Sequence, residues 1–169
     1  ERLFCGIACG VMDQFTSQLG RPDSLLAIHC GNMLTQDVKI PSDVVFVVID
    51  SMISRDAGSV LNDRKRECLL ALESLQEAGW DITTLSAVTK TDLENVAEYL
   101  GEKLYHRVVH IANENQRVRD GIELLRQNNV REFGKLMVQS HFSSRDLYDI
   151  SHPNLEILID IAQNHEESI

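Results

Sequence analysis

The first part of the chain, up to about residue 56, alternates short apolar runs with turn residues, a pattern typical of β-strands. It predicts strands at residues 24–30 and 34–40, joined by the turn Gly31-Asn32. Residues 44–49 are apolar throughout, as is typical of a strand buried on both faces. Because the three runs are close in sequence, we expect them to form an antiparallel meander.

From about residue 58 onward, the apolar residues recur with a helical period. One helix is predicted at residues 59–78, where Gly79 ends it. The sequence Thr91-Asp92-Leu93-Glu94 has the form of a capping box and predicts a helix that continues to Leu100. Further helices are predicted at residues 102–128, 130–142 and 153–161, the last with Pro153 in its first turn. The whole pattern predicts an α+β fold, with a small antiparallel sheet followed by a helical layer.

Composition and net charge argue against some classes of function for this chain. The net charge of −10 at pH 7 argues against a nucleic-acid partner, which would need a basic face, but it does not exclude a nucleotide pocket. No apolar run approaches the roughly 20 residues of a membrane span, and the first residues carry no basic and apolar leader. The four cysteines lack a dense disulfide spacing, so we expect free thiols in a reducing, cytoplasmic compartment.

Asp13 is the first candidate for chemistry, because it is the only charged residue between Cys5 and Gln18. A lone carboxylate in such a stretch can cap a helix, pair with a buried cation or act in catalysis. Residue types alone favour the helix cap. Gly10, three residues earlier, would let a ligand approach the backbone closely.

A second candidate is the row His106, His110 and Glu114, whose spacing of four places all three on one helix face. Such a row could hold a zinc ion. Because no further ligand is specified, we favour a polar helix face on which Glu114 pairs with a histidine or a neighbouring arginine, and we expect no metal site.

Residues 140–146 (Ser-His-Phe-Ser-Ser-Arg-Asp) contain the residue types of a Ser/His/Asp triad. Residues so close in sequence rarely form one, because triads are assembled across a fold. We expect instead a hydrogen-bonded helix end that enters a loop, with Arg145 pairing with Asp146 or another carboxylate.

Residues 63–67 (Asp-Arg-Lys-Arg-Glu) could bind phosphate, but a solvated helix face of mixed charge is the favoured interpretation. The chain contains no GxGxxG or Walker pattern that would form a phosphate loop.

The run Cys9-Gly10-Val11-Met12-Asp13-Gln14-Phe15 resembles the CGIMDQF motif of galactokinases, in the GHMP family of small-molecule kinases. Several later blocks resemble the same family in the same order. They are residues 25–30, 64–68, 106–118, 133–146 and 153–156. The resemblance therefore extends over nearly the whole chain.

This resemblance implies Mg-ATP-dependent phosphorylation of a monosaccharide, first of all galactose, at its anomeric hydroxyl. Asp13 falls on the catalytic aspartate of the family, and Gly10 falls where the family contacts the sugar through its backbone. The expected partners are thus a sugar and ATP with Mg²⁺. In the two-lobed fold of the family, residues 1–56 would form the lobe junction and residues 57–169 the mainly helical part of the C-terminal domain.

Three elements of the family are missing from this sequence: the GRVNLIGEH-like segment, the GGGLSSSA phosphate loop and the GAGFGGC-like loop. We therefore expect a middle and later part of a kinase, which would pack on the missing lobe or associate with itself. Residues 50–59 lack the tyrosine and histidine that the family has there. That departure leaves two alternatives: an L-arabinokinase-type enzyme for another sugar, and a non-catalytic sensor of sugar and nucleotide.

Overall fold

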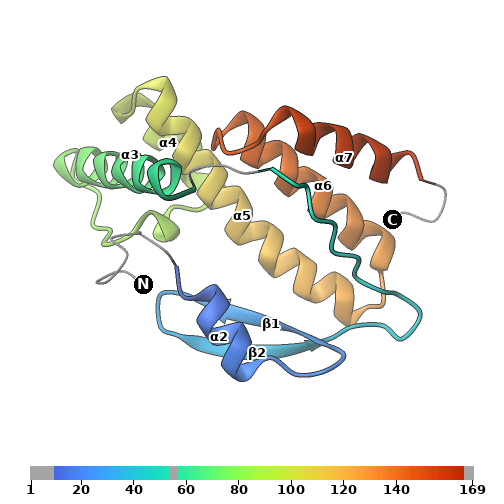
Figure 1. Ribbon diagram of the computed structural model, residues 1–169. Helices are drawn as coiled ribbons and strands as arrows, with labels where there is room; N and C mark the ends of the chain where they lie inside the picture. Colours follow the sequence, from blue (N-terminus) through green and yellow to red (C-terminus); the bar gives the residue numbers. More distant parts are fainter. Residues whose placement is uncertain (1–9, 54–56, 166–169) are drawn as a thin grey trace.

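The computed structural model describes residues 10–53 and 57–165, and Figure 1 shows their arrangement. Strands β1 (Ser24–His29) and β2 (Leu34–Lys39) form an antiparallel hairpin in which Ala27 lies opposite Gln36. The turn at Gly31-Asn32 is confirmed, since the carbonyl of His29 accepts hydrogen bonds from the backbone N–H groups of Asn32 and Met33. Helix α2 (Met12–Leu19), which the sequence pattern did not predict, contacts β1.

Helices make up most of the rest of the described chain. In order they are α3 (Ala57–Glu77), α4 (Leu93–Val96), α5 (Glu102–Arg126), α6 (Val130–Asp146) and α7 (Pro153–Gln163), with 3₁₀ turns η1 (Leu85–Ala87), η2 (Lys90–Asp92) and η3 (Ala97–Tyr99). Helix α5 is central, because it contacts α3, α4, α6 and β2. The predicted α+β class, a small antiparallel sheet followed by a helical layer, is confirmed.

The core lies between α3, α5 and the segment that joins them. Its largest fully buried side chains are those of Leu75, Val88, Val96 and Val108. Burial of each such side chain contributes roughly 1.5–3 kcal/mol relative to exposure. Gly79 ends α3 as predicted: its φ of 93° is in the left-handed region, and the N–H of Trp80 bonds back to the carbonyl of Leu75.

The predicted capping box at Thr91 and Glu94 is wrong by two residues. Instead, the carboxylate of Asp92 accepts hydrogen bonds from the backbone N–H of Thr89 at 2.9 Å and from its hydroxyl at 2.6 Å. These bonds lower the pKa of Asp92. The capping box is therefore formed by Thr89 and Asp92. The helix predicted to follow is divided into η2, α4 and η3.

The third predicted strand, residues 44–49, is also wrong. This segment has no strand structure, and the meander consists of two strands. Residues 44–49 run along α6 instead (Figure 1). There the rings of Phe46 and Phe133 pack edge to face, with their centroids 6.3 Å apart. Val45, Val47 and Val48 are 85%, 76% and 95% exposed. The apolar run has the composition of a buried strand, but no strand within the described residues pairs with it.

No helix among the described residues is both long enough and apolar enough to cross a lipid bilayer.

We predict that residues 44–49 cause the 169-residue chain to associate with itself, because an exposed apolar β-type segment pairs readily with another copy. The double variant Val47→Lys/Val48→Lys should shift sedimentation velocity profiles toward the monomer. The variant Ser86→Lys/Ala87→Lys adds the same charge at exposed positions of η1 and should leave the profiles unchanged. Equal association in both variants would contradict this prediction.

Candidate active site

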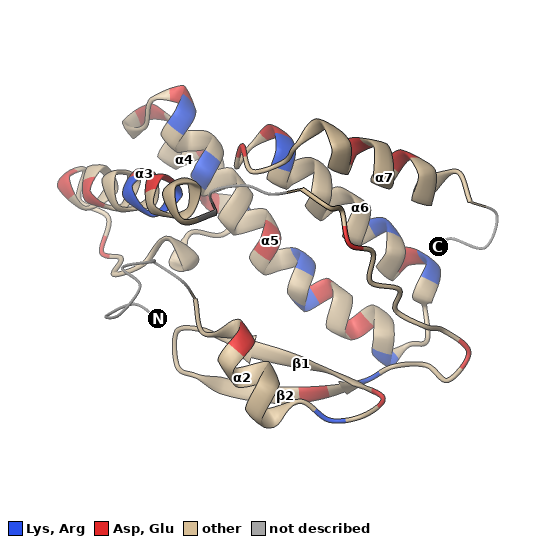
Figure 2. Cartoon of the chain, in the orientation of Figure 1, with Lys and Arg blue, Asp and Glu red and all other residues tan. Residues whose placement is uncertain are grey.

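Asp13 is in the first turn of α2 and is the only charged residue of that helix (Figure 2). The position before the helix belongs to Val11, which makes no side-chain capping bond. The interpretation of Asp13 as a helix cap is therefore wrong. Its carboxylate is exposed and lies at the positive end of the helix dipole, which stabilises negative charge there.

Gly10 is exposed, and an added Cβ would meet no atom within 4 Å among the described residues. The backbone just before α2 is therefore open to a ligand, and Asp13 follows it after less than one helical turn. Cys9, the first residue of the motif, lies outside the described residues. Together Gly10 and Asp13 place an approachable backbone next to an accessible carboxylate.

The row of His106, His110 and Glu114 lies on α5 as predicted, and the polar groups of His110 and Glu114 have protein partners. Glu114 pairs with Arg117 and accepts a 2.7 Å hydrogen bond from the hydroxyl of Ser140. His110 is buried, with its Nδ1 2.8 Å from the hydroxyl of Ser143. The expected pairing of Glu114 with a neighbouring arginine is confirmed. Within the described chain, no cluster of three His, Cys, Asp or Glu residues could hold a metal ion.

Residues 140–146 complete α6 instead of entering a loop. His141 and Arg145 both reach Glu156 on α7, at 3.1 and 3.0 Å, and Arg145 also binds Asp146 at 2.6 Å. The predicted pairing of Arg145 with Asp146 is confirmed. Hydrogen bonds from Ser151, His141 and Arg145 lower the pKa of Glu156 to about 2. Ser140 binds Glu114 instead, so these residues join helices and do not form a triad.

The interpretation of residues 63–67 as a solvated face is wrong for two of them. Arg64 and Glu67 are buried where α3 lies against the first turns of α5, and Figure 2 shows charges of both signs there. Glu67 Oε2 accepts a 2.7 Å hydrogen bond from Nε of the buried Arg107 and lies 3.2 Å from Nε of Arg64. Lys103 binds the other carboxylate oxygen. We call Arg64, Glu67 and Arg107 the ion cluster.

The two guanidinium groups of the ion cluster extend to the end of α6. Arg107 donates to the carbonyl of Leu147, and Arg64 donates to the carbonyl of Tyr148 at 3.1 Å. Burial alone would raise the pKa of Glu67. Hydrogen bonds from Lys103 and Arg107, with the nearby positive charges, outweigh burial and lower it. The carboxylate is thus held in its charged form, and it joins α3 to α5.

A second group of side chains, formed by the buried His110 with the half-buried Cys68 and Tyr148, lies next to the ion cluster. The rings of His110 and Tyr148 stack with centroids 4.3 Å apart, and the Tyr148 hydroxyl lies 3.5 Å from the sulfur of Cys68. Burial raises the pKa values of Cys68 and Tyr148 and lowers that of His110, so all three are kept neutral. Cys68 and Cys30 are free thiols, as predicted for these two cysteines.

Comparison with known proteins shows which proteins this chain resembles in sequence and in fold. Over 97% of its length the chain is 37% identical to the galactokinase of Roseiflexus sp. (strain RS-1). It is also 37% identical to the galactokinase of Chloroflexus aggregans, and 33% identical to that of Pasteurella multocida, in each case over 96% of its length. The chain is galactokinase-like along nearly its whole length. No family model matches it.

The galactokinase-like chain spans 42% of the length of each of these relatives. Its fold matches a crystal structure of Lactococcus lactis galactokinase complexed with galactose, with a TM-score of 0.86 and 24% sequence identity. That match covers 97% of this chain and 43% of the solved one. The galactokinase fold is therefore present in this chain over the part that the two proteins share.

Replacing Glu67 with glutamine should destabilise the fold by about 3–5 kcal/mol, because two buried guanidinium groups lose their buried counter-ion and keep only the exposed Asp149. Urea denaturation at pH 7 measures the change. The matched control is Glu73→Gln, an exposed position on the same helix, where the change should stay within about 0.5 kcal/mol. Equal stability of the two variants would show that the ion cluster contributes nothing.

His110 should make the fold less stable in mild acid. In the unfolded chain the His110 side chain binds a proton near pH 6.5, whereas in the folded chain it binds one only at lower pH, because burial lowers its pKa. Unfolding therefore takes up a proton as the pH falls below about 6.5, and the free energy of unfolding decreases by at most about 1.4 kcal/mol per pH unit. The variant His110→Gln should show a shallower decrease between pH 7.5 and 5.5. An unchanged slope would contradict this assignment.

Proposed function

We propose that this protein takes part in the phosphorylation of a monosaccharide, with galactose the first candidate and the anomeric hydroxyl the acceptor. The observation that carries the proposal is the similarity to three curated galactokinases along at least 96% of the chain. The protein of matching fold was crystallised with galactose, which supports the choice of sugar. The accessible pair of Gly10 and Asp13 gives the chain a group that can act on a sugar hydroxyl.

In this proposal Asp13 accepts or orients the proton of the attacking hydroxyl. Phosphoryl transfer needs little covalent help from a protein, but it needs the attacking oxygen held in line. A carboxylate within hydrogen-bond reach of the hydroxyl can do this. The exposed position of Asp13 leaves its carboxylate free to meet a sugar, and the open backbone at Gly10 lets the sugar come close.

ATP with Mg²⁺ is the proposed phosphate donor, as the resemblance implies. The described residues do not fit a triphosphate. The chain has no glycine-rich phosphate loop, and Arg64 is enclosed in the ion cluster. No cluster of carboxylates suited to Mg²⁺ occurs within residues 10–53 and 57–165. We therefore assign no step to the nucleotide or the metal, and we propose a role for this chain only at the sugar hydroxyl.

In the full polypeptide that the gene encodes, Asp13→Asn should lower the rate of galactose phosphorylation about 10²–10⁴-fold, because the hydroxyl loses its proton acceptor. The rate is measured by coupled ADP release. The exposed control Asp43→Asn, which removes the same charge from a turn, should keep full activity. The thermal midpoint of Asp13→Asn should stay within about 4 °C of that of the parent, since Asp13 is exposed and loses only its interaction with the helix dipole.

Normal turnover in Asp13→Asn would reject the proposed role of this residue. Phosphorylation of L-arabinose in preference to galactose would keep the role and change the sugar. Sugar binding without phosphorylation of any sugar would identify a sensor and reject the enzymatic proposal.

A further inference from the structure

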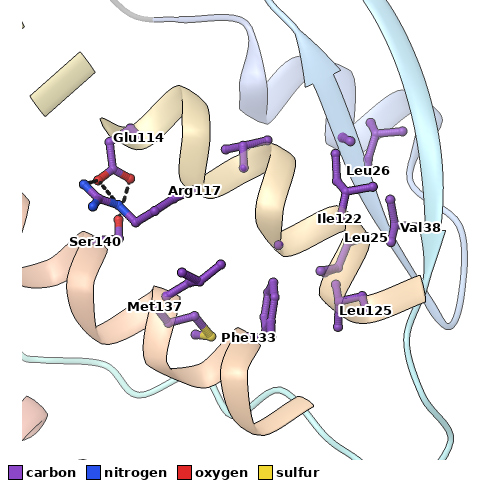
Figure 3. A pocket seen from close by; sticks show the side chains of 14 residues that line it. Leu25, Leu26, Val38, Glu114, Arg117, Ile122, Leu125, Phe133, Met137 and Ser140 are labelled. Atoms are coloured by element: carbon purple, nitrogen blue, oxygen red, sulfur yellow. Dashed lines mark hydrogen bonds and ion pairs between the residues drawn. The ribbon is translucent and has the colours of Figure 1, made fainter. Parts of the chain in front are cut away.

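A cavity of about 240 Å³, open to solvent on one side, lies between the sheet and the helix pair α5 and α6 (Figure 3). Most of its wall is apolar, and residues from all four elements contribute to it. Representative lining residues are Leu25 and Val38 from the sheet, Ile122 and Leu125 from α5, and Phe133 and Met137 from α6. None of the lining residues belongs to α2 or includes Gly10, so the cavity is separate from the proposed sugar site.

The polar groups of the cavity are gathered at one end, where Figure 3 shows Glu114, Arg117 and Ser140 together. Arg117 donates both Nε and Nη2 to one oxygen of Glu114, and Ser140 donates to the other oxygen at 2.7 Å. The positive and negative charges therefore neutralise each other. A charged ligand would lose part of its hydration here without gaining an unpaired counter-ion, which is costly against an apolar wall.

We propose that this cavity is a binding site for a small, neutral, apolar molecule, aromatic or branched aliphatic. Its volume exceeds the roughly 150 Å³ of an enclosed apolar cavity, engineered in another protein, that is large enough to bind benzene. It is below the range of about 300–1,000 Å³ that is usual for drug-sized ligands. A single substituted ring therefore matches the space.

Two probes of similar size test the preference for a neutral ligand: toluene and benzoate, which differ in a methyl and a carboxylate group. Titration calorimetry on the 169-residue protein should give a Kd on the order of 0.1–1 mM for toluene. Benzoate should bind about tenfold more weakly or not at all. Equal affinities, or no binding of toluene, would overturn the proposal.

The location of the site is tested in two ways. In methyl-labelled protein, toluene should give nuclear Overhauser contacts to Leu25, Ile122 and Leu125, and contacts confined to other methyl groups would overturn the assignment. Ala27, which lines the cavity, can be enlarged to fill it. Ala27→Leu should abolish toluene binding, whereas Ala87→Leu, at an exposed position of η1, should retain it. Unchanged binding in folded Ala27→Leu would also overturn the proposal.

Discussion

One buried carboxylate between two buried guanidinium groups sets the geometry of the helical layer. Glu67 lies between Arg64 and Arg107, and burial of either cation without this partner would cost several kcal/mol. One terminal nitrogen of each guanidinium, Nη1, donates to a backbone carbonyl, that of Leu147 for Arg107 and that of Tyr148 for Arg64. Helices α3 and α5 and the end of α6 must therefore meet in one arrangement, which an apolar contact alone would not impose.

Helix α5, which the ion cluster holds in place, contacts most of the other elements of the fold. Helix α5 begins at the ion cluster and continues to the sheet, where it contacts β2. The sheet in turn supports α2, whose first turn presents Asp13. The residues that stabilise the helical layer are thus separate from the residues proposed for chemistry. A change at Glu67 should act on folding, whereas a change at Asp13 should act on the reaction.

Sequence patterns were sufficient wherever local chemistry decides the structure. The helical period predicted α3, α5, α6 and α7, and Gly79 predicted the end of α3. Sequence patterns did not predict the burial and pairing of side chains whose partners are distant in sequence. Arg64 and Glu67 look solvated in sequence, and only Arg107, 40 positions after Glu67, makes them a buried pair. Likewise, residues 140–146 look in sequence like a helix end that enters a loop, whereas they complete α6, and Ser140 and Arg145 bind the distant Glu114 and Glu156.

The candidate site likewise combines features that the sequence predicted with features that it did not. The motif around Asp13 was visible in sequence, and the structure replaced its interpretation as a helix cap with an exposed carboxylate in the first turn of α2. Residues 44–49 have the composition of a buried strand, but composition cannot supply the neighbouring strand that burial needs. The cavity between the sheet and α5 was not visible at all, because its walls come from four separate elements.

The central claim is that this chain contributes the proton-handling carboxylate of a sugar kinase. The most direct measurement is to identify the product by ³¹P and ¹H nuclear magnetic resonance after incubating the gene's full polypeptide with galactose, ATP and Mg²⁺. For the parent the account predicts galactose carrying a phosphate on its anomeric oxygen, formed in equal amount with ADP, and for Asp13→Asn little of this product in the same time. Release of ADP with inorganic phosphate and unchanged sugar, or no reaction with any monosaccharide, would contradict it.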